Sequence, residues 1–274
     1  MSAIVVVHPK VDLDACLCVV LAGAEPGEVH FIPAGAKEIP EICPCCGERL
    51  IDPRVLDHPL GEKGRLDEDG TRHCAAASMP EATKAAPELL AEVEEQDSTG
   101  KVEHPRFSLP QILQAVRREA EARGLSGAAL DRAIITAMAP ILRGLNLLYQ
   151  EEQAARELLP KLRIELVGGC KFAILPVGKT PPQLSKILAE ETDVSCEIYW
   201  EVGPGVFNLG IYRYPGRITP DLRELKPYLP GWFVHSAGFL ACWGNAKSPE
   251  TTPPPSDTPQ SQEELVALVK RVFG

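Results

Sequence analysis

An unbroken run of β-branched residues near the N-terminus constrains the fold more than any other feature of the sequence. The segment 4–7 reads Ile-Val-Val-Val, which is typical of a strand buried on both faces of a parallel sheet. A helical stretch follows from Asp14, the expected N-cap, to Leu21. The segment 29–32 is the next expected strand. Because parallel strands need a long crossover connection, this order predicts a βαβ unit.

The rest of the chain divides into a helical middle and a second α/β part. Helical patterns cover 73–79, 81–95, 111–123 and 128–159, and Pro140 predicts a kink or break in the last of these. Strand patterns cover 54–56, 164–167, 172–176, 196–202 and 206–212, with a helix over 183–191. We therefore predict an α/β protein with four parts. These are a parallel-sheet N-terminal domain (1–105), a helical connector (106–162), a smaller mixed α/β domain (163–248), and a flexible Pro-rich tether with a terminal helix (249–274).

Composition and charge exclude several classes of protein. The 274 residues are 45% hydrophobic and 24% charged, as in soluble globular proteins. With 28 basic and 38 acidic residues, the net charge of -10 argues against a broad basic face for nucleic acid, but not against phosphate binding through metal ions. No apolar run reaches the ~18 residues that span a bilayer, and no targeting peptide is visible. We expect a cytoplasmic protein that contacts no membrane.

The strongest chemical signal is a set of metal-binding side chains directly after the first strand. His8, Asp12 and Asp14 have the spacing H-x3-D-x-D. Open α/β sheets bind their ligands at the carboxyl ends of parallel strands. Carboxylate oxygens with one imidazole suit Mn²⁺ or Mg²⁺ better than a structural zinc. The alternative interpretation is a capped helix with solvated His8 and Asp12 side chains.

Two weaker acidic signals lie further along the chain. Asp57 and His58 end a short apolar strand, and an Asp beside a ligating His can orient the imidazole ring. Asp97 lies in an acidic helix end, which on its own is typical of a solvated charge run.

The nine cysteines are a further signal, in a chain expected to stay in a reducing compartment. Cys43-Pro44-Cys45-Cys46-Gly47 contains the C-P-x-C-G knuckle that forms half of a zinc ribbon, with Cys43 and Cys46 as Zn²⁺ ligands. The candidates for the two further ligands are Cys45, Cys74, His73 and His58. Reduced thiols without a metal are the alternative. Five others lie in apolar segments and are expected in the core: Cys16, Cys18, Cys170, Cys196 and Cys242.

These residues resemble the DHH superfamily of metal-dependent phosphoesterases. The spacing H-x3-D-x-D-A at 8–15 matches its first motif, Asp57-His58 matches the start of its Asp-His-His motif, and Asp97 falls where it has a last metal-binding Asp. The sequence Phe-Val-His-Ser-Ala-Gly-Phe at 233–239, followed by Gly244 and Lys247, is most similar to the melanocyte-proliferating-gene branch. That branch is described as metal-dependent hydrolases or 3′–5′ RNA exonucleases.

The resemblance implies a role for each matched residue. His8 and Asp12 would bind one Mn²⁺ or Mg²⁺ ion, and Asp14, His58 and Asp97 would bind a second. Asp57 and His235 are the residues expected in catalysis. His235, Gly238 and Lys247 would bind a substrate phosphate from the second domain, with the active site in the cleft between domains. The expected substrate is a phosphodiester, namely a nucleotide or a short single-stranded RNA, and a homodimer is left open.

Two departures from the family pattern leave a second hypothesis. Pro59 replaces the second His of the Asp-His-His motif, and the cysteine segment stands where the family has an Asp that bridges both metals. The first hypothesis is a metal-dependent phosphodiesterase. The alternative is a degenerate protein of the same fold that binds zinc through Cys43 and Cys46, or a phosphorylated ligand, without turnover. A pyrophosphatase is disfavoured by the C-terminal segment.

Overall fold

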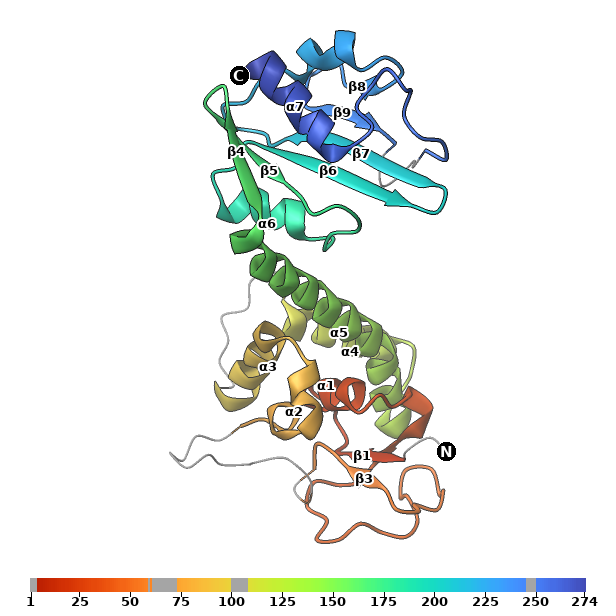
Figure 1. The fold of residues 1–274 in the computed structure, drawn as a ribbon. Helices are drawn as coiled ribbons and strands as arrows, with labels where there is room; N and C mark the ends of the chain where they lie inside the picture. Colours follow the sequence, from red (N-terminus) through yellow and green to blue (C-terminus); the bar gives the residue numbers. More distant parts are fainter. Residues whose placement is uncertain (1–3, 59, 61–72, 100–107, 245–249) are drawn as a thin grey trace. The chain divides into compact units, whose positions relative to one another are not determined.

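The protein is an α/β protein with a parallel sheet in one unit and a mixed sheet in the other, as the sequence predicts (Figure 1). The computed structural model describes residues 4–58, 60, 73–99, 108–244 and 250–274. The chain forms two compact units, Met1–Gln150 and Glu151–Gly274, which are described separately. The finer four-part division stays a prediction.

The first unit contains the predicted βαβ unit. Strands β1 (Val5–Val7), β2 (Val29–Phe31) and β3 (Arg54–Val55) form a parallel sheet in the order β2-β1-β3. Helix α1 (Leu13–Leu21) and the 3₁₀ turn η1 (Pro26–Glu28) connect the first two strands. Val5 and Val7 lie in the core beneath the helices, whereas Val6 lies in a small separate core. The β-branched run is therefore buried on both faces, as expected.

Helices cover one face of this sheet. They are α1, α2 (Ala75–Ser78), α3 (Pro87–Thr99), α4 (Leu109–Ala122) and the first part of α5 (Gly127–Leu158). The prediction of one helix over 81–95 is wrong, because η2 (Pro80–Lys84) is a 3₁₀ helix and α3 starts only at Pro87. A proline disfavours helical backbone in the residue before it and fits the first helical turn, so the chain restarts there.

The expected N-cap of the first helix is also wrong. Asp12, not Asp14, is the N-cap of α1, and its Oδ1 accepts a hydrogen bond from the Ala15 N–H at 2.9 Å. Helix α5 runs through Pro140 without a break, and a kink at this residue stays a prediction. None of the helices in the described ranges is both long and apolar enough to span a membrane.

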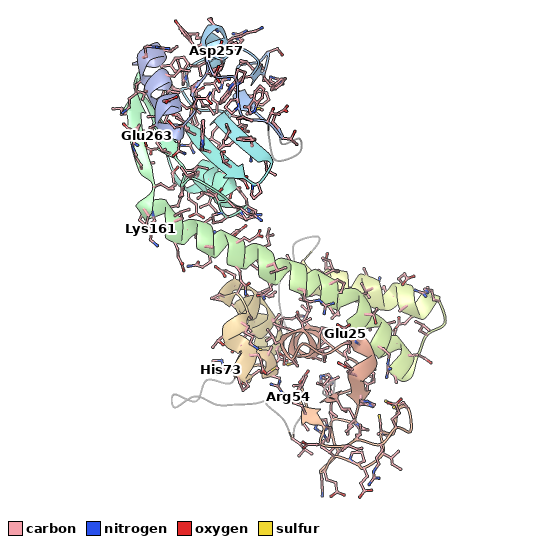
Figure 2. The ribbon with its side chains drawn as sticks, turned by 45° about the vertical axis from the view of Figure 1, so that its right-hand side comes forward. Glu25, Arg54, His73, Lys161, Asp257 and Glu263 are labelled. Carbon is pink, nitrogen blue, oxygen red and sulfur yellow. The ribbon has the colours of Figure 1, made fainter. Side chains whose placement is uncertain are left out.

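Strand β3 is held to the helical layer by an ion pair. Arg54 on β3 donates two hydrogen bonds to the carboxylate of Glu81 on η2, at 2.7 and 2.5 Å. Figure 2 shows where Arg54 lies on the sheet of the first unit. Both side chains are partly buried, so the pair fixes the start of the strand that leads to Asp57.

The second unit is a six-stranded mixed sheet. Its strands are β4 (Arg163–Val167), β5 (Cys170–Ile174), β6 (Cys196–Gly203), β7 (Val206–Arg213), β8 (Phe233–Val234) and β9 (Leu240–Trp243), in the order β4-β5-β6-β7-β9-β8. Only β5 and β6 pair in parallel, and α6 (Leu184–Glu191) connects them. The turn η3 (Leu159–Lys161) precedes β4. Helix α6 packs on one face, while η4 (Leu222–Tyr228) and α7 (Gln262–Phe273) pack on the other.

The C-terminal segment is packed against the second unit and is not the flexible tether that its proline content predicts. Glu250 pairs with Phe207 on the inner strand β7, and the Trp232 indole N–H donates to Thr258. Helix α7 buries Leu265 and Val269 in the core. Contacts of this kind hold the Pro-rich part in place although it forms no regular helix or strand. The five predicted core cysteines are all buried.

Candidate functional site

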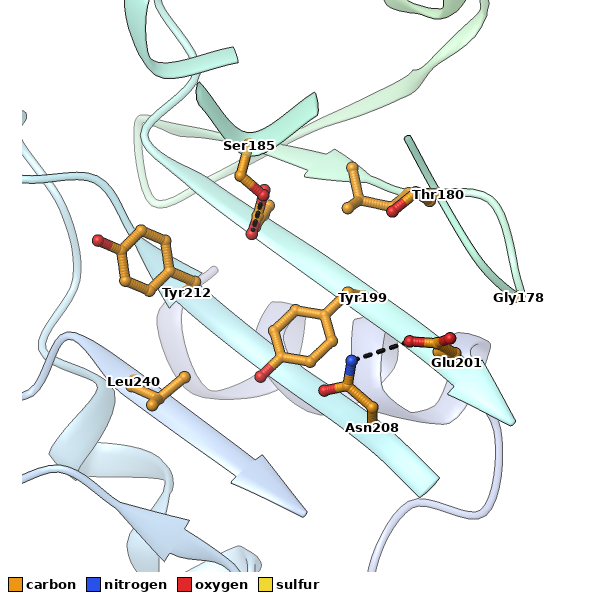
Figure 3. A pocket seen from close by; sticks show the side chains of 10 residues that line it. Gly178, Thr180, Ser185, Tyr199, Glu201, Asn208, Tyr212 and Leu240 are labelled. Carbon is orange, nitrogen blue, oxygen red and sulfur yellow. Dashed lines mark hydrogen bonds between the residues drawn. The ribbon is translucent and has the colours of Figure 1, made fainter. Parts of the chain in front are cut away.

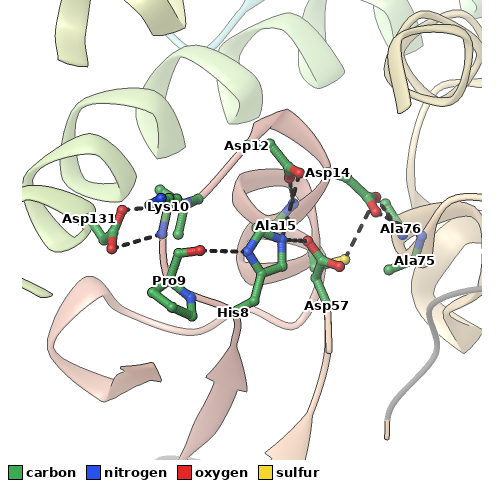
Figure 4. A network of polar contacts seen from close by, with 12 residues as sticks. His8, Pro9, Lys10, Asp12, Asp14, Ala15, Asp57, Ala75, Ala76 and Asp131 are labelled. Carbon is green, nitrogen blue, oxygen red and sulfur yellow. Dashed lines mark hydrogen bonds and ion pairs between the residues drawn. The ribbon is translucent and has the colours of Figure 1, made fainter. Parts of the chain in front are cut away.

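His8, Asp12 and Asp57 meet at the carboxyl ends of two adjacent parallel strands (Figure 4). His8 directly follows β1, and Asp57 follows β3 by two residues. The His8 Nε2 lies 2.9 Å from Asp57 Oδ2 and 3.6 Å from Asp12 Oδ2. One ligand atom from each of the three residues lies within 4.8 Å of the other two. The sequence predicted His8 and Asp12 as ligands and placed Asp57 in catalysis.

The loop between β1 and α1 holds the His8 ring in place. The His8 Nδ1 lies 2.8 Å from the Pro9 carbonyl, which leaves Nε2 toward the two carboxylates. Asp131 on α5 accepts hydrogen bonds from the backbone N–H groups of Lys10 and Val11 at 3.0 and 3.1 Å. Lys10 has a φ of 64°, so these bonds hold the loop in a left-handed conformation that costs free energy.

The electrostatics of this centre favour a cation. Hydrogen bonds to Asp12 and Asp57 raise the pKa of His8 to about 10, against the opposing effect of burial. Asp57 is fully buried, and burying a carboxylate is costly unless a positive charge compensates it. One imidazole and two carboxylates within mutual reach form a donor set that suits Mn²⁺ or Mg²⁺. The three residues therefore fit one divalent ion, which would displace the proton from the His8 Nε2.

Asp14 and Asp97 lie beside this centre. Both Asp14 oxygens accept hydrogen bonds at 2.8 Å, one from the Ala75 N–H and one from the Ala76 N–H. Burial and the nearby charge of Asp57 raise the pKa of Asp14 to about 7. Asp12, Asp14 and Asp97 line a pocket of about 120 Å³. The structure thus brings Asp97 from the end of α3 to the motif at the start of α1.

His58 does not point toward the other predicted ligands. Its Nε2 lies 2.9 Å from the Pro33 carbonyl, and its Nδ1 accepts a hydrogen bond from the Leu60 N–H at 3.3 Å. The ring is fully buried, and both of its nitrogens have partners. His58 therefore ties the strand end after β3 to the loop after β2. Pro59, which departs from the family motif, lies outside the described residues.

The cysteine segment gathers around a histidine that the sequence did not single out. His30, Cys43, Cys45 and Cys46 each offer a ligand atom within 4.8 Å of the others. Burial disfavours the Cys43 thiolate, but hydrogen bonds from Cys45, His30 and Cys46 outweigh it and lower its pKa to about 6. The other expected ligands are engaged elsewhere: His73 contacts Glu94, and Cys74 caps α2.

The predicted phosphate-binding turn in the second unit is well defined. It connects β8 to β9, and the His235 ring stacks at a centroid distance of 4.0 Å on Phe239. The His235 Nδ1 accepts a hydrogen bond from the Ala237 N–H at 3.1 Å. In the neutral ring the proton therefore sits on Nε2, which can donate to an anion. Gly238 is in this turn, and Lys247 lies outside the described residues.

The Asp221 side chain approaches Gly238 so closely that only glycine fits there, and its replacement by alanine should destabilise the second unit. Gly238 has a φ of 67°, and an added Cβ would lie 2.2 Å from Asp221 Oδ1. Gly216 has a similar φ of 76° with nothing within 4 Å, so it is a matched control. We expect Gly238→Ala to cost roughly 1–3 kcal/mol more than Gly216→Ala in urea unfolding. Equal costs would show that the Asp221 contact is unimportant.

A second pocket, of about 250 Å³, lies in the second unit and was not predicted (Figure 3). Its polar lining includes Tyr199, Glu201 and Asn208, and the Asn208 amide donates to Glu201 at 3.0 Å. Glu197 on β6 also lines it and is buried. Burial raises the pKa of Glu197 above its usual 4.5, although hydrogen bonds from Tyr214 and Ser185 oppose the shift.

The raised pKa of Glu197 predicts a pH-dependent stability. Such a group adds to the free energy of unfolding. This contribution is fully present below pH 4.5 and is lost as the pH rises through the higher folded-state pKa. Glu197→Gln removes this loss, so its stability relative to wild type should increase from pH 4.5 to pH 7.5 in urea titrations. Glu197→Ala leaves the buried Tyr214 hydroxyl without its acceptor and should cost about 1–3 kcal/mol. A pH-independent difference for Glu197→Gln would contradict this account.

Comparisons with known proteins give no family assignment. No family profile and no curated protein matches the sequence. Among solved structures, the pGpG-specific phosphodiesterase PggH from Vibrio cholerae is similar at 13% sequence identity and a TM-score of 0.31. The match covers 99% of this chain and 98% of that chain. A similarity at this level does not establish a shared fold or activity.

Proposed function

We propose that the protein is a divalent-metal-dependent phosphodiesterase with a DHH-type metal centre. The observation that carries the proposal is the meeting of His8, Asp12 and Asp57 at the carboxyl ends of β1 and β3. Parallel α/β sheets bind their ligands at this edge. The first-motif spacing at residues 8–15 supports membership of the superfamily, and the segment 233–239 supports its exonuclease-like branch.

The residues of the centre have distinct roles in this proposal. His8, Asp12 and Asp57 hold one Mn²⁺ or Mg²⁺ ion, with the His8 ring oriented by the Pro9 carbonyl. Such an ion polarises a phosphoryl oxygen and lowers the pKa of a bound water. Asp57 would supply a buried carboxylate to the centre from the end of the strand beside β1, whereas the cysteine segment offers none.

A second ion would rely on Asp14 and Asp97. Both line the same pocket as Asp12, which places their carboxylates beside the first centre. His58 does not fit a second ion in this conformation, because Pro33 and Leu60 occupy its two ring nitrogens. We assign it instead to holding the segment after β3.

The proposed substrate is a phosphodiester, either a nucleotide or a short single-stranded RNA. In the second unit, His235 can donate from Nε2 to a phosphate oxygen because its Nδ1 already accepts from Ala237. The turn is held in this form by the Gly238 N–H, which donates to the His235 carbonyl at 2.8 Å. His235→Ala should raise the KM for an oligoribonucleotide more than it lowers kcat, if the residue binds and does not react.

Activity measurements test this function directly. Purified protein with Mn²⁺ should hydrolyse an aryl phosphodiester or a short oligoribonucleotide, and a chelator should stop the reaction. Asp14→Ala should abolish it, whereas Asp193→Asn, an exposed carboxylate in the other unit, should not. Full activity in Asp14→Ala would contradict the assignment. Pyrophosphate should not be hydrolysed.

Two observations favour the non-catalytic alternative. His58 faces away from the centre, and the cysteine segment gathers with His30 into a cluster of metal-binding side chains. A protein that keeps the fold but binds zinc or a phosphorylated ligand without turnover would show zinc and no Mn²⁺-dependent activity on any phosphoester. The same activity measurements separate the two functions, because zinc at the cysteine segment is compatible with both.

A further inference from the structure

The segment between β2 and β3 places four metal-binding side chains together, outside the proposed catalytic centre. One ligand atom each from His30, Cys43, Cys45 and Cys46 lies within 4.8 Å of the other three. We propose that these four residues bind one zinc ion as a tetrahedral Cys₃His centre with a structural role. This proposal does not depend on phosphodiesterase activity.

The backbone around the cysteines has the form of a tight chain reversal. The Cys43 N–H donates to the Glu48 carbonyl at 2.8 Å, and the Gly47 N–H donates to the Cys43 carbonyl at 2.8 Å. Gly47 has a φ of 78°, a conformation that glycine adopts at low cost. The Leu50 N–H donates to the Glu41 carbonyl, which closes a short hairpin. This hairpin presents all three cysteines from one turn.

One of two distances between ligand atoms is close to that of a tetrahedral zinc site, and the other is shorter. With Zn–S near 2.3 Å and Zn–N near 2.0–2.1 Å, two ligand atoms lie about 3.6–3.8 Å apart. The Cys46 Sγ lies 3.4 Å from His30 Nδ1. The Cys43 and Cys45 Sγ atoms lie 2.8 Å apart, so they would separate by about 1 Å around an ion.

His30 also has a carboxylate near its second ring nitrogen. Its Nδ1 faces the Cys46 sulfur, while its Nε2 lies 3.6 Å from the Glu48 carboxylate. At hydrogen-bond distance such a carboxylate fixes the tautomer and orients the first nitrogen toward a metal. Glu48 is in the same hairpin as the cysteines, so a small shift of its side chain would bring it to that distance.

The alternation of β2 explains why His30 faces the cysteines. Val29 and Phe31 lie in the core beneath the helices, so His30 and Ile32 face the opposite side of the sheet. On that side the buried apolar residues are few: Val6, Ile32, Cys43 and Leu50. Two large apolar side chains of the same segment, Ile42 and Ile51, are 59% and 70% exposed.

So few buried apolar residues are not enough to stabilise the fold of the long segment between β2 and β3. Between Phe31 and Arg54 the structure has neither a helix nor a regular strand, and loops of this length are uncommon within compact domains. A bound metal can supply folding free energy where the apolar core is insufficient. Three thiolates with one imidazole select zinc over Mn²⁺ or Mg²⁺, which prefer oxygen ligands.

Metal content of the purified full-length protein tests the proposal. Protein prepared in reductant without added metal should contain about one zinc per chain by elemental analysis. Cys43→Ala, Cys46→Ala and His30→Ala should lose most of it. His30→Cys should retain it, because Cys₄ is also a common zinc set. The control Cys16→Ala removes a buried thiol outside the cluster and should leave the zinc content unchanged.

Two measurements on wild-type protein keep the test decisive if the variants fold poorly. Cobalt substituted for zinc should give the visible absorption of a tetrahedral thiolate complex. Titration with a mercurial reagent should release the zinc as three thiols react. The proposal is overturned by a zinc-free reduced protein, by iron in place of zinc, by a Cys43–Cys45 disulfide, or by a zinc content that Cys43→Ala and Cys46→Ala leave unchanged.

Discussion

Replacing Asp57 with asparagine should lower Mn²⁺ affinity and Mn²⁺-dependent phosphodiester hydrolysis by at least about 100-fold. Asp57 is fully buried and supplies the carboxylate closest to the His8 Nε2. Asparagine has the same shape but no charge, so it keeps the contact with His8 and loses the attraction for a divalent ion. The effect on the metal should therefore greatly exceed the effect on the fold.

The shift of the unfolding temperature on addition of Mn²⁺ measures this difference. Wild-type protein should be stabilised by Mn²⁺, and Asp57→Asn should not be. Asp52→Asn is a matched control, since Asp52 is exposed in the same segment and its φ of 47° suits asparagine. An unchanged Mn²⁺ response in Asp57→Asn would remove Asp57 from the centre.

Loss of the proposed zinc should have the largest effect on stability. Structural zinc sites contribute roughly 10–16 kcal/mol of binding free energy at neutral pH, comparable with the whole stability of a domain. Cys43→Ala or His30→Ala should therefore lower the unfolding temperature far more than Cys16→Ala, measured by circular dichroism in reductant. Similar shifts in all three variants would show that no metal stabilises the segment.

The same loss should weaken the proposed catalytic centre. The cysteine hairpin leads directly into β3, and Asp57 follows that strand. His58 also bonds to Pro33 at the start of the segment. We expect zinc-depleted variants to bind Mn²⁺ at least about tenfold more weakly, as when groups around a metal site are disturbed. An unchanged Mn²⁺ affinity would show that the two sites are independent.

The local sequence pattern predicts much of the first unit. The β-branched run at 4–7 and the helical connection to the next strand are sufficient for a parallel βαβ unit, because few other arrangements bury such a strand on both faces. The choice between Asp12 and Asp14 as N-cap was not predictable in this way. It depends on α2, whose first N–H groups bond to Asp14, and α2 is distant in sequence.

The candidate site depends still more on tertiary contacts. His8 and Asp12 are recognisable because their spacing follows one strand. The grouping of Asp57 with them requires knowing that β3 pairs with β1, and the orientation of His58 depends on the Pro33 carbonyl. His30 sits in an apolar strand, so only the alternation of β2 and the position of the cysteine hairpin reveal its role.

In the second unit, too, local pattern predicts the elements, whereas the polar contacts depend on tertiary structure. Strands and helices follow the predicted periods, but a lone glutamate within β6 carries no signal until Tyr214 and Ser185 are seen to bond to it. For the Pro-rich segment before α7, composition predicts a flexible chain, and this prediction is wrong. Contacts such as that between Trp232 and Thr258 fix the segment.

Crystals grown with Mn²⁺ test the central claim most directly, through anomalous scattering measured at the manganese edge. We predict an anomalous peak among the ligand atoms of His8, Asp12 and Asp57, which is absent in crystals of Asp57→Asn. Manganese bound elsewhere, or no manganese in wild-type crystals that otherwise show these three side chains ordered, would contradict the proposed centre.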